Sequence, residues 1–221
     1  DLSAAENLVP LNVEYSNKNR PSKPAAYALK ARVYLSMRNY PKALEYANLT
    51  LQLYDSLLNF NDLDTVILNP INRENSEVIF QSQLLENNIF SAVAFPEVIV
   101  DSGLYNSYKE GDLRPLIFYL KGFAGNINLK ASFSGSFYPF SGIATDELLL
   151  IKAECLARAG YFEEALDQLN GLLITRFKTG EFVPYIASSP EEALNFILEE
   201  RRKELAFRGI RWTDLRRLNQ E

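Results

Sequence analysis

The chain has 221 residues, 47% of them hydrophobic, which is enough apolar material for one well-buried domain. Its formal net charge of −5 disfavours nucleic acid as the main partner. There is no histidine and only one cysteine, Cys155, so the commonest general base, the commonest metal ligand and an internal disulfide are all missing. No run approaches the ~20 apolar residues of a membrane-spanning helix. We therefore expect neither a metal site nor a cofactor.

A pair of helices joined by a tight turn is predicted over residues 24–54. Ser22 precedes Pro24, and together they have the form of a helix start. Apolar residues then recur at helical spacing as far as the turn at residues 38–40. Pro41 begins the second helix, so the segment reads as a helical hairpin.

Residues 55–145 have a different character and are predicted to form a long, irregular insertion. A short extended segment is expected at residues 77–81, and the stretch 122–141 is rich in Gly, Ser and Asn. Asp112 is expected to cap the segment that follows it or to pair with Arg114.

The helical hairpin recurs at residues 146–173. A shift of 122 positions places Ala31 on Ala153 and Ala43 on Ala165, and small residues at these positions let two helices approach closely. Each copy resembles the tetratricopeptide (TPR) helix–turn–helix, although the tryptophan and glycine of that pattern are not kept. Because the copies are not in tandem, the chain is not a simple solenoid.

The C-terminal stretch 190–217 is predicted to hold a long helix at about 190–207 and a shorter piece after Gly209. Ser189 and Glu192 have the spacing of a helix N-cap, with Pro190 in the first turn. Arg201 lies on the apolar stripe of this helix, so we expect it to be buried and hydrogen-bonded. The only tryptophan, Trp212, is expected to pack against the main body.

The many charges of this stretch are predicted to compensate one another on a solvent-exposed face. Glu199 can pair with Lys203, and Glu204 with Arg208, at i,i+4. Asp214 can pair with Arg217 at i,i+3. This pattern indicates a self-compensated helix rather than a phosphate-binding stripe.

The order Glu-Arg-Arg-Lys-Glu-Leu-Ala-Phe-x-Gly-x-Arg-Trp-x-Asp-Leu-Arg-Arg, here residues 200–217, resembles the C-terminal signature of the SusD/RagB family. The resemblance implies a mainly all-α, SusD-like fold with TPR-like hairpins and a long loop insertion. It implies that residues 1–221 are a single domain, the C-terminal portion of a longer protein. Family members are surface-exposed outer-membrane lipoproteins, so the lipid anchor is expected to lie outside this chain.

The same resemblance implies a non-enzymatic function, in which the protein captures oligosaccharide nutrients and passes them to a SusC-like TonB-dependent transporter. A neutral sugar offers hydroxyls and an apolar face, which suit flat aromatic side chains with nearby polar groups. The insertion has that mixture, and its candidate ligand contacts are Tyr105, Tyr108, Phe137 and Tyr138. The competing interpretation is that these aromatics are core residues that anchor the insertion.

Two other functions are weaker. A glycosidase needs two carboxylates that face a cleft, and Asp101, Glu110, Asp112 and Asp146 are available, but no nucleophile or phosphate-loop motif is present. A peptide-binding TPR-type scaffold, or a protein-interaction module, is the alternative to glycan binding. Since the hairpins are separated along the chain, their concave face is expected to be filled from within.

Overall fold

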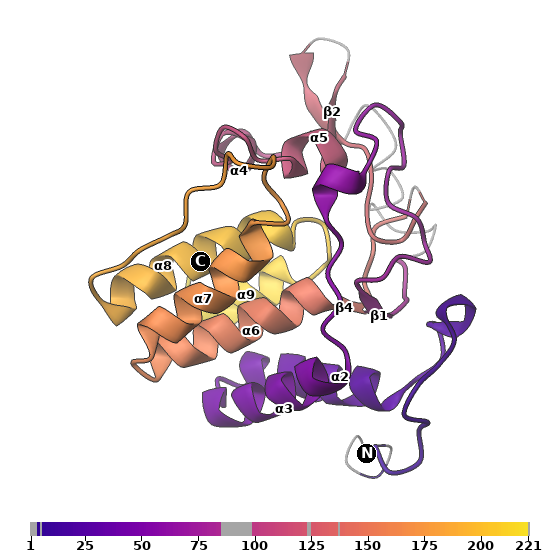
Figure 1. Cartoon of the computed structure of the whole chain (residues 1–221), viewed down its shortest axis with the longest axis vertical. Helices are drawn as coiled ribbons and strands as arrows, with labels where there is room; N and C mark the ends of the chain where they lie inside the picture. Colours follow the sequence, from indigo (N-terminus) through magenta and orange to yellow (C-terminus); the bar gives the residue numbers. More distant parts are fainter. Residues whose placement is uncertain (1–3, 5, 85–98, 123–124, 137, 221) are drawn as a thin grey trace.

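The computed structural model describes residues 4, 6–84, 99–122, 125–136 and 138–220. Helices dominate these residues, and the strands form two sheets of two strands each. Figure 1 shows helix α6 lying between helix α7 and the α2–α3 hairpin, with much of the insertion at the opposite end of the molecule from α2 and α3. The predicted mainly helical fold is confirmed. Among the described helices, none has the length and apolarity needed to cross a membrane.

The first hairpin consists of α2 (Lys23–Ser36) and α3 (Tyr40–Leu53). The Ser22 hydroxyl accepts a hydrogen bond from the Ala25 amide, and the Asn39 side chain accepts from the Lys42 amide, so each helix has the polar cap that its first turn requires. The two helices approach through alanines, among them Ala31 and Ala43, which are fully buried. The small side chains therefore set the spacing between the helices.

The second hairpin consists of α6 (Thr145–Arg158) and α7 (Phe162–Leu173), and α6 also packs against α3 and α8 (Pro190–Glu204). One apolar cluster joins α6, α7 and α8 and includes Ala153, Leu169 and Ile197. The Ser189 hydroxyl accepts from the Glu192 amide, and the Glu192 carboxylate accepts from the Ser188 amide at 2.8 Å. These bonds fix the start of α8 where the sequence predicted it.

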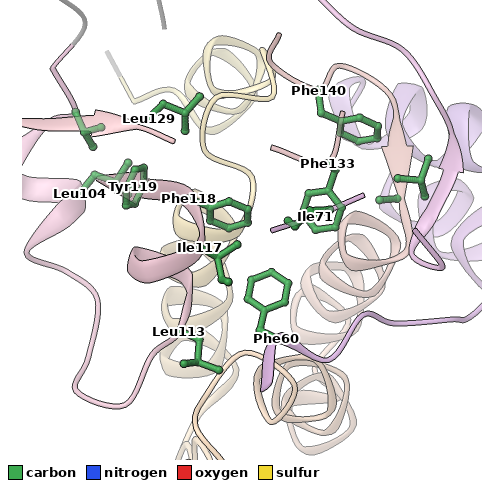
Figure 2. Packing of buried hydrophobic residues seen from close by; sticks show 13 residues of the cluster. Phe60, Ile71, Leu104, Leu113, Ile117, Phe118, Tyr119, Leu129, Phe133 and Phe140 are labelled. Carbon is green, nitrogen blue, oxygen red and sulfur yellow. The ribbon is translucent and has the colours of Figure 1, made fainter. Parts of the chain in front are cut away.

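The insertion contains short elements that are held together by an aromatic core. These are the 3-10 helix η2 (Phe60–Asp62), β1 (Val78–Phe80), α4 (Ser102–Tyr105), α5 (Arg114–Phe118), β2 (Tyr119–Lys121), β3 (Ile127–Leu129) and β4 (Ile143–Ala144); another 3-10 helix, η1 (Tyr15–Asn17), precedes α2. Figure 2 shows Phe60, Phe118, Phe133 and Phe140 meeting at the centre of this core. The predicted extended segment at 77–81 is strand β1.

The two small sheets are antiparallel. Strand β1 pairs with β4 directly before α6, and β2 pairs with β3. Gly142 lies beside Phe80, where an added Cβ would approach the Phe80 carbonyl oxygen to 2.0 Å. Only glycine fits this crossing, which brings the insertion back to the second hairpin.

The turn between α8 and α9 (Arg211–Leu218) corrects one prediction. Gly209 has a φ of +75°, as expected for the residue that ends this segment, although α8 itself stops at Glu204. Trp212 was expected to pack against the main body, but 69% of its surface is exposed. It lies in the first turn of α9 on the solvent side, whereas Asp214 and Arg217 occupy the buried side.

Candidate functional site

Two of the predicted ligand contacts, Tyr105 and Tyr108, lie together in the insertion. Both rings meet the ring of Tyr119 edge to face, with centroid distances of 5.9 Å and 5.8 Å. Tyr119 is buried at the start of β2, and its other face meets Phe207. Sequence reasoning missed Tyr119 because it sits within an apolar stretch, which reads as core rather than as part of a site.

Tyr108 is held by polar contacts as well as by packing. Its hydroxyl donates to the Lys203 carbonyl oxygen at 2.9 Å and lies 3.0 Å from the Tyr119 hydroxyl. The guanidinium of Arg114 lies 5.3 Å from the centre of its ring. Burial and the neighbouring Tyr119 raise the pKa of Tyr108 well above its usual value. Tyr108 therefore ties the insertion to α8, as the core interpretation expects.

Tyr105 is half-buried, as Tyr108 is. Tyr105 ends the short helix α4, whose start is fixed by the Asp101 carboxylate, which accepts from the Leu104 amide at 2.8 Å. Its ring is half-buried against Tyr119, and Asn106 beside it is exposed. A rigidly backed aromatic ring beside an exposed amide can bind a ligand that has both an apolar face and hydrogen-bonding groups.

Of the other two predicted contacts, the structure describes only Tyr138. Phe137 lies outside the described residues. Tyr138 is half-buried in a serine-rich turn, where its carbonyl oxygen accepts hydrogen bonds from the hydroxyls of Ser132 and Ser134. This turn packs beside Arg73, close to Gly135. The described contacts bring Tyr105 and Tyr108 together and give Tyr138 different neighbours.

Beneath the insertion, α8 contributes to a buried network of ion pairs. Arg114 donates to Asp112, Glu200 and Glu204, and Arg176 donates to Glu204 at 2.8 Å. This corrects the predicted solvent-exposed face. Lys203 pairs with Glu200 rather than with Glu199, and neither Glu204 nor Lys203 is exposed.

The network also joins the second hairpin to the C-terminal segment. Arg208 binds both carboxylate oxygens of Asp146 and lies over the Phe133 ring, so it does not pair with Glu204 as predicted. The predicted Asp214–Arg217 pair is confirmed at 2.7 Å, and Arg217 also binds Glu154 of α6. Arg201 is buried as predicted, with its Nε donating to Asp214 at 2.9 Å.

Three carboxylates of this network, from Glu77, Asp146 and Glu204, lie within 4.8 Å of one another and have the ligand types that bind hard cations. Arginines already neutralise them, however. Burial, offset in part by Arg176, raises the pKa of Glu77 to about 8. Burial also raises the pKa of Asp146, whereas the arginines hold that of Glu204 below its usual value. The donor set fits a structural ion-pair cluster better than a metal centre.

Two candidate catalytic carboxylates are also accounted for by structural contacts. Asp112 accepts from the Arg114 amide at 2.9 Å and binds its guanidinium, as the sequence predicted. Asp146 is bound by Arg208. Asp101 is exposed and pairs with Arg202 at 3.0 Å. Asp112 and Asp146 cannot face a substrate without breaking buried ion pairs.

A groove of about 440 Å³ runs between the two helical hairpins. Asn48 and Gln52 of α3 line one side, and Asp167 and Gln168 of α7 line the other, with Lys152 of α6 between them. The hairpins were expected to fill their concave face from within. Packing of α6 against α3 and α7 fills part of it, but this polar groove remains open.

Comparison with known proteins agrees with the resemblance. A sequence model of the SusD family matches residues 132–221. A SusD-like carbohydrate binding protein from Bacteroides vulgatus is 20% identical, with a TM-score of 0.78 over 99% of this chain and 50% of that chain. One from Bacteroides fragilis is 17% identical, with a TM-score of 0.74 over 99% and 56% of the two chains.

A SusD superfamily protein from Bacteroides thetaiotaomicron is 23% identical, with a TM-score of 0.72 over 98% of this chain and 53% of that chain. The chain therefore spans about half the length of the solved proteins that it matches. A search of curated proteins found no match. At these identities the solved structures show a shared fold, and the family assignment rests on the matched C-terminal segment with its signature residues. Residues 132–221 thus match the SusD family, and the chain as a whole has the fold of SusD-like proteins.

Proposed function

We propose that this chain is part of a non-enzymatic, surface-exposed protein that captures oligosaccharides. The observation that carries the proposal is the alignment of 99% of the chain with a SusD-like carbohydrate binding protein. The helical hairpins use their apolar faces for packing, whereas the half-buried Tyr105 of the insertion keeps part of its side chain accessible. Loops on a rigid scaffold are the usual place for ligand contacts.

Within this proposal, Tyr105 provides the flat surface for a sugar ring, and Asn106 beside it can exchange hydrogen bonds with sugar hydroxyls. Tyr119 and Tyr108 hold the platform from behind. Tyr138, on the serine-rich turn, is proposed as a further contact, as is Phe137, its neighbour in the sequence. Each aromatic platform contributes about 0.5–1.5 kcal/mol beyond area burial, by analogy with aromatic pairs. A few such contacts give micromolar to millimolar dissociation constants.

Titration calorimetry against a panel of neutral oligosaccharides tests the proposal. We expect Tyr105→Ala to weaken binding several-fold, and the effect of salt to be small because a neutral sugar makes no ion pairs. Tyr161→Ala is the matched control, since Tyr161 is 57% exposed in the turn of the second hairpin. If Tyr105→Ala, Phe137→Ala and Tyr138→Ala all bind the parent's glycan unchanged, this site is wrong. Release of product would reject the non-enzymatic function.

The proposal extends to transport: the captured glycan is passed to a SusC-like TonB-dependent transporter, and a lipid anchor outside this chain holds the protein at the outer membrane. The helical hairpins are the proposed transporter-facing side. A pull-down with a SusC-like transporter from the same organism tests the step. Charge reversal at exposed Lys42 and Glu45 of α3 should reduce capture, whereas Tyr105→Ala should not. Capture that is reduced by Tyr105→Ala but not by the charge reversals would indicate that the transporter binds the insertion instead.

The groove between the hairpins favours one second candidate, a peptide-binding scaffold. Amide side chains such as Asn48, Gln52 and Gln168 can pair with the backbone of an extended peptide. Binding of a peptide library that is lost in Gln52→Ala and Gln168→Ala, but kept in Tyr105→Ala, would support this function. Glycan binding that is unchanged in both groove variants would support the first function, glycan capture.

A further inference from the structure

The most exposed aromatic surface on the C-terminal helix is Trp212, and the proposed glycan site does not use it. Trp212 is 69% exposed and forms, with Leu215, Arg216, Asn219 and Gln220, a concavity of about 920 Å³. An indole combines a broad apolar face with an N–H donor, so an exposed indole can both stack on a ligand ring and donate a hydrogen bond.

The polar lining of this concavity identifies the kind of ligand. Arg216 follows Trp212 by one helical turn, so the two side chains are neighbours on the same face of α9. Asn219 and Gln220 add amide donors and acceptors at the end of the helix. A flat ring beside several hydrogen-bonding groups is suited to a sugar, which offers an apolar ring face together with hydroxyls.

The surface around Trp212 is positively charged although the chain as a whole carries −5. Arg211 and Arg216 are exposed, and among the described residues neither has a carboxylate within ion-pair distance. The acid of this helix, Asp214, is buried and already binds Arg201 and Arg217. Partial burial and the nearby charge of Arg202 lower the pKa of Arg211, which is consistent with excess positive charge here.

Arg38, from another part of the chain, binds the C-terminal end of α9, so the Arg216 side chain is not needed there. The Arg38 guanidinium donates to the Arg216 carbonyl oxygen at 3.1 Å and to the Asn219 side-chain oxygen at 2.6 Å. Arg38 therefore compensates the negative end of α9, and also holds Asn219 in its left-handed conformation at the helix terminus. The Arg216 guanidinium needs no role at the helix end and can bind an anion.

We propose that Trp212 and Arg216 form a second carbohydrate site, separate from Tyr105, for an acidic sugar. The indole stacks on the ring face, and the guanidinium forms paired hydrogen bonds with a carboxylate or sulfate group. Asn219 and Gln220 bind hydroxyls of the same or the next residue. This site is independent of neutral-glycan binding at Tyr105.

Trp212 is the only tryptophan, so its fluorescence reports the site directly. The probes are an oligogalacturonate with its methyl ester, and a sulfated dextran oligomer with unmodified dextran; each pair differs in charge but keeps its sugar rings. We expect at least one anionic probe to change Trp212 emission saturably, and its neutral counterpart to bind about fivefold to tenfold more weakly. Added salt should weaken the binding of the anionic probe.

Variants locate the binding. Arg216→Gln should reduce affinity for the anionic probe to that of its neutral counterpart, and calorimetry should detect no binding to Trp212→Ala. Arg20→Gln removes the same charge from an exposed position on another segment and should bind as the parent does. Tyr105→Ala should also bind the acidic probe normally, which separates this result from the fate of the neutral-glycan site.

Several results would overturn the proposal. These are no response to either anionic probe, equal binding of charged and neutral partners, or equal losses in Arg20→Gln and Arg216→Gln. Reversible self-association that Trp212→Ala abolishes, without any response to the probes, would assign the surface to a second copy of the chain.

Discussion

Arg176 donates a buried hydrogen bond to Glu77, with 2.5 Å between Nη2 and Oε1, although the two residues lie 99 positions apart in the chain. The Glu77 carboxylate also accepts from the Leu58 amide at 2.8 Å. The contact thus joins the residue directly before β1 to the segment that follows α7. Arg176 favours the ionised form of the Glu77 carboxyl, whereas the nearby carboxylates of Asp146 and Glu204 disfavour it.

This arrangement predicts an unusual pH dependence of stability. Burial raises the pKa of Glu77 from 4.5 to about 8, so the folded state holds a proton that the unfolded state has lost. Stability from this group is therefore greatest below pH 4.5 and declines as pH rises towards 8, by at most about 1.4 kcal/mol per pH unit. Glu200 has the opposite effect. Its pKa is lowered from 4.5 to about 2, so its contribution to stability is lost as the pH falls from about 4.5 towards 2.

Glu77→Gln should flatten the decline in unfolding free energy between pH 5 and 8, whatever its effect at a single pH. Denaturant unfolding across this range is the measurement. Glu74→Gln, at an exposed position three residues earlier, should keep the slope of the parent. An unchanged slope in Glu77→Gln would mean that Glu77 is ionised in the folded state at pH 7.

Arg201→Met should cost about 2–4 kcal/mol of unfolding free energy. The side chain is buried and binds Asp214, although its Nη1 has no hydrogen-bond partner within the described structure. Asp214 keeps its bond to Arg217, which limits the loss. Arg202→Met, at the exposed next position, should change stability by less than about 1 kcal/mol. Equal stability of the two variants would contradict a structural role for Arg201.

Trp212→Ala should change stability by no more than about 0.5 kcal/mol, because the exposed indole loses little packing. The parent should show red-shifted tryptophan emission that is readily quenched by iodide. A loss of several kcal/mol, or blue-shifted emission from the parent, would place the indole in the core instead.

Ala43→Leu should destabilise the first hairpin by about 1–3 kcal/mol, because Ala43 is fully buried where α3 meets α2 and a larger side chain forces the helices apart. Glu45→Leu adds bulk on the exposed side of the same helix and should stay within about 0.5 kcal/mol. Thermal unfolding of both variants tests whether small residues set the helix spacing.

Tyr108→Phe should cost about 1 kcal/mol, since it removes the hydroxyl that donates to the Lys203 carbonyl oxygen. Glycan affinity at Tyr105 should remain within about twofold, because the ring that supports the platform is kept. A variant as stable as the parent but unable to bind would make the Tyr108 hydroxyl a direct ligand contact.

The sequence by itself determined the helical hairpins and their caps. Ser22, Asn39 and Ser189 act on amides three residues away, so the information for each helix start lies within one turn. Alanine at matched positions likewise indicated close helix packing. The Asp214–Arg217 pair and the Asp112–Arg114 contact were predictable for the same reason, because the partners lie two or three residues apart.

Only the tertiary structure decided where the other charges and Trp212 would lie. The helical spacing predicted that Glu204 pairs with Arg208, one turn away. The fold instead buries Glu204 beside Arg114 and Arg176, and Arg208 binds Asp146. A buried charge must be compensated by whichever groups are desolvated with it, and these come from segments far apart in the chain. Helical periodicity likewise cannot say which face of a short helix remains in solvent, and for α9 that choice left Trp212 exposed.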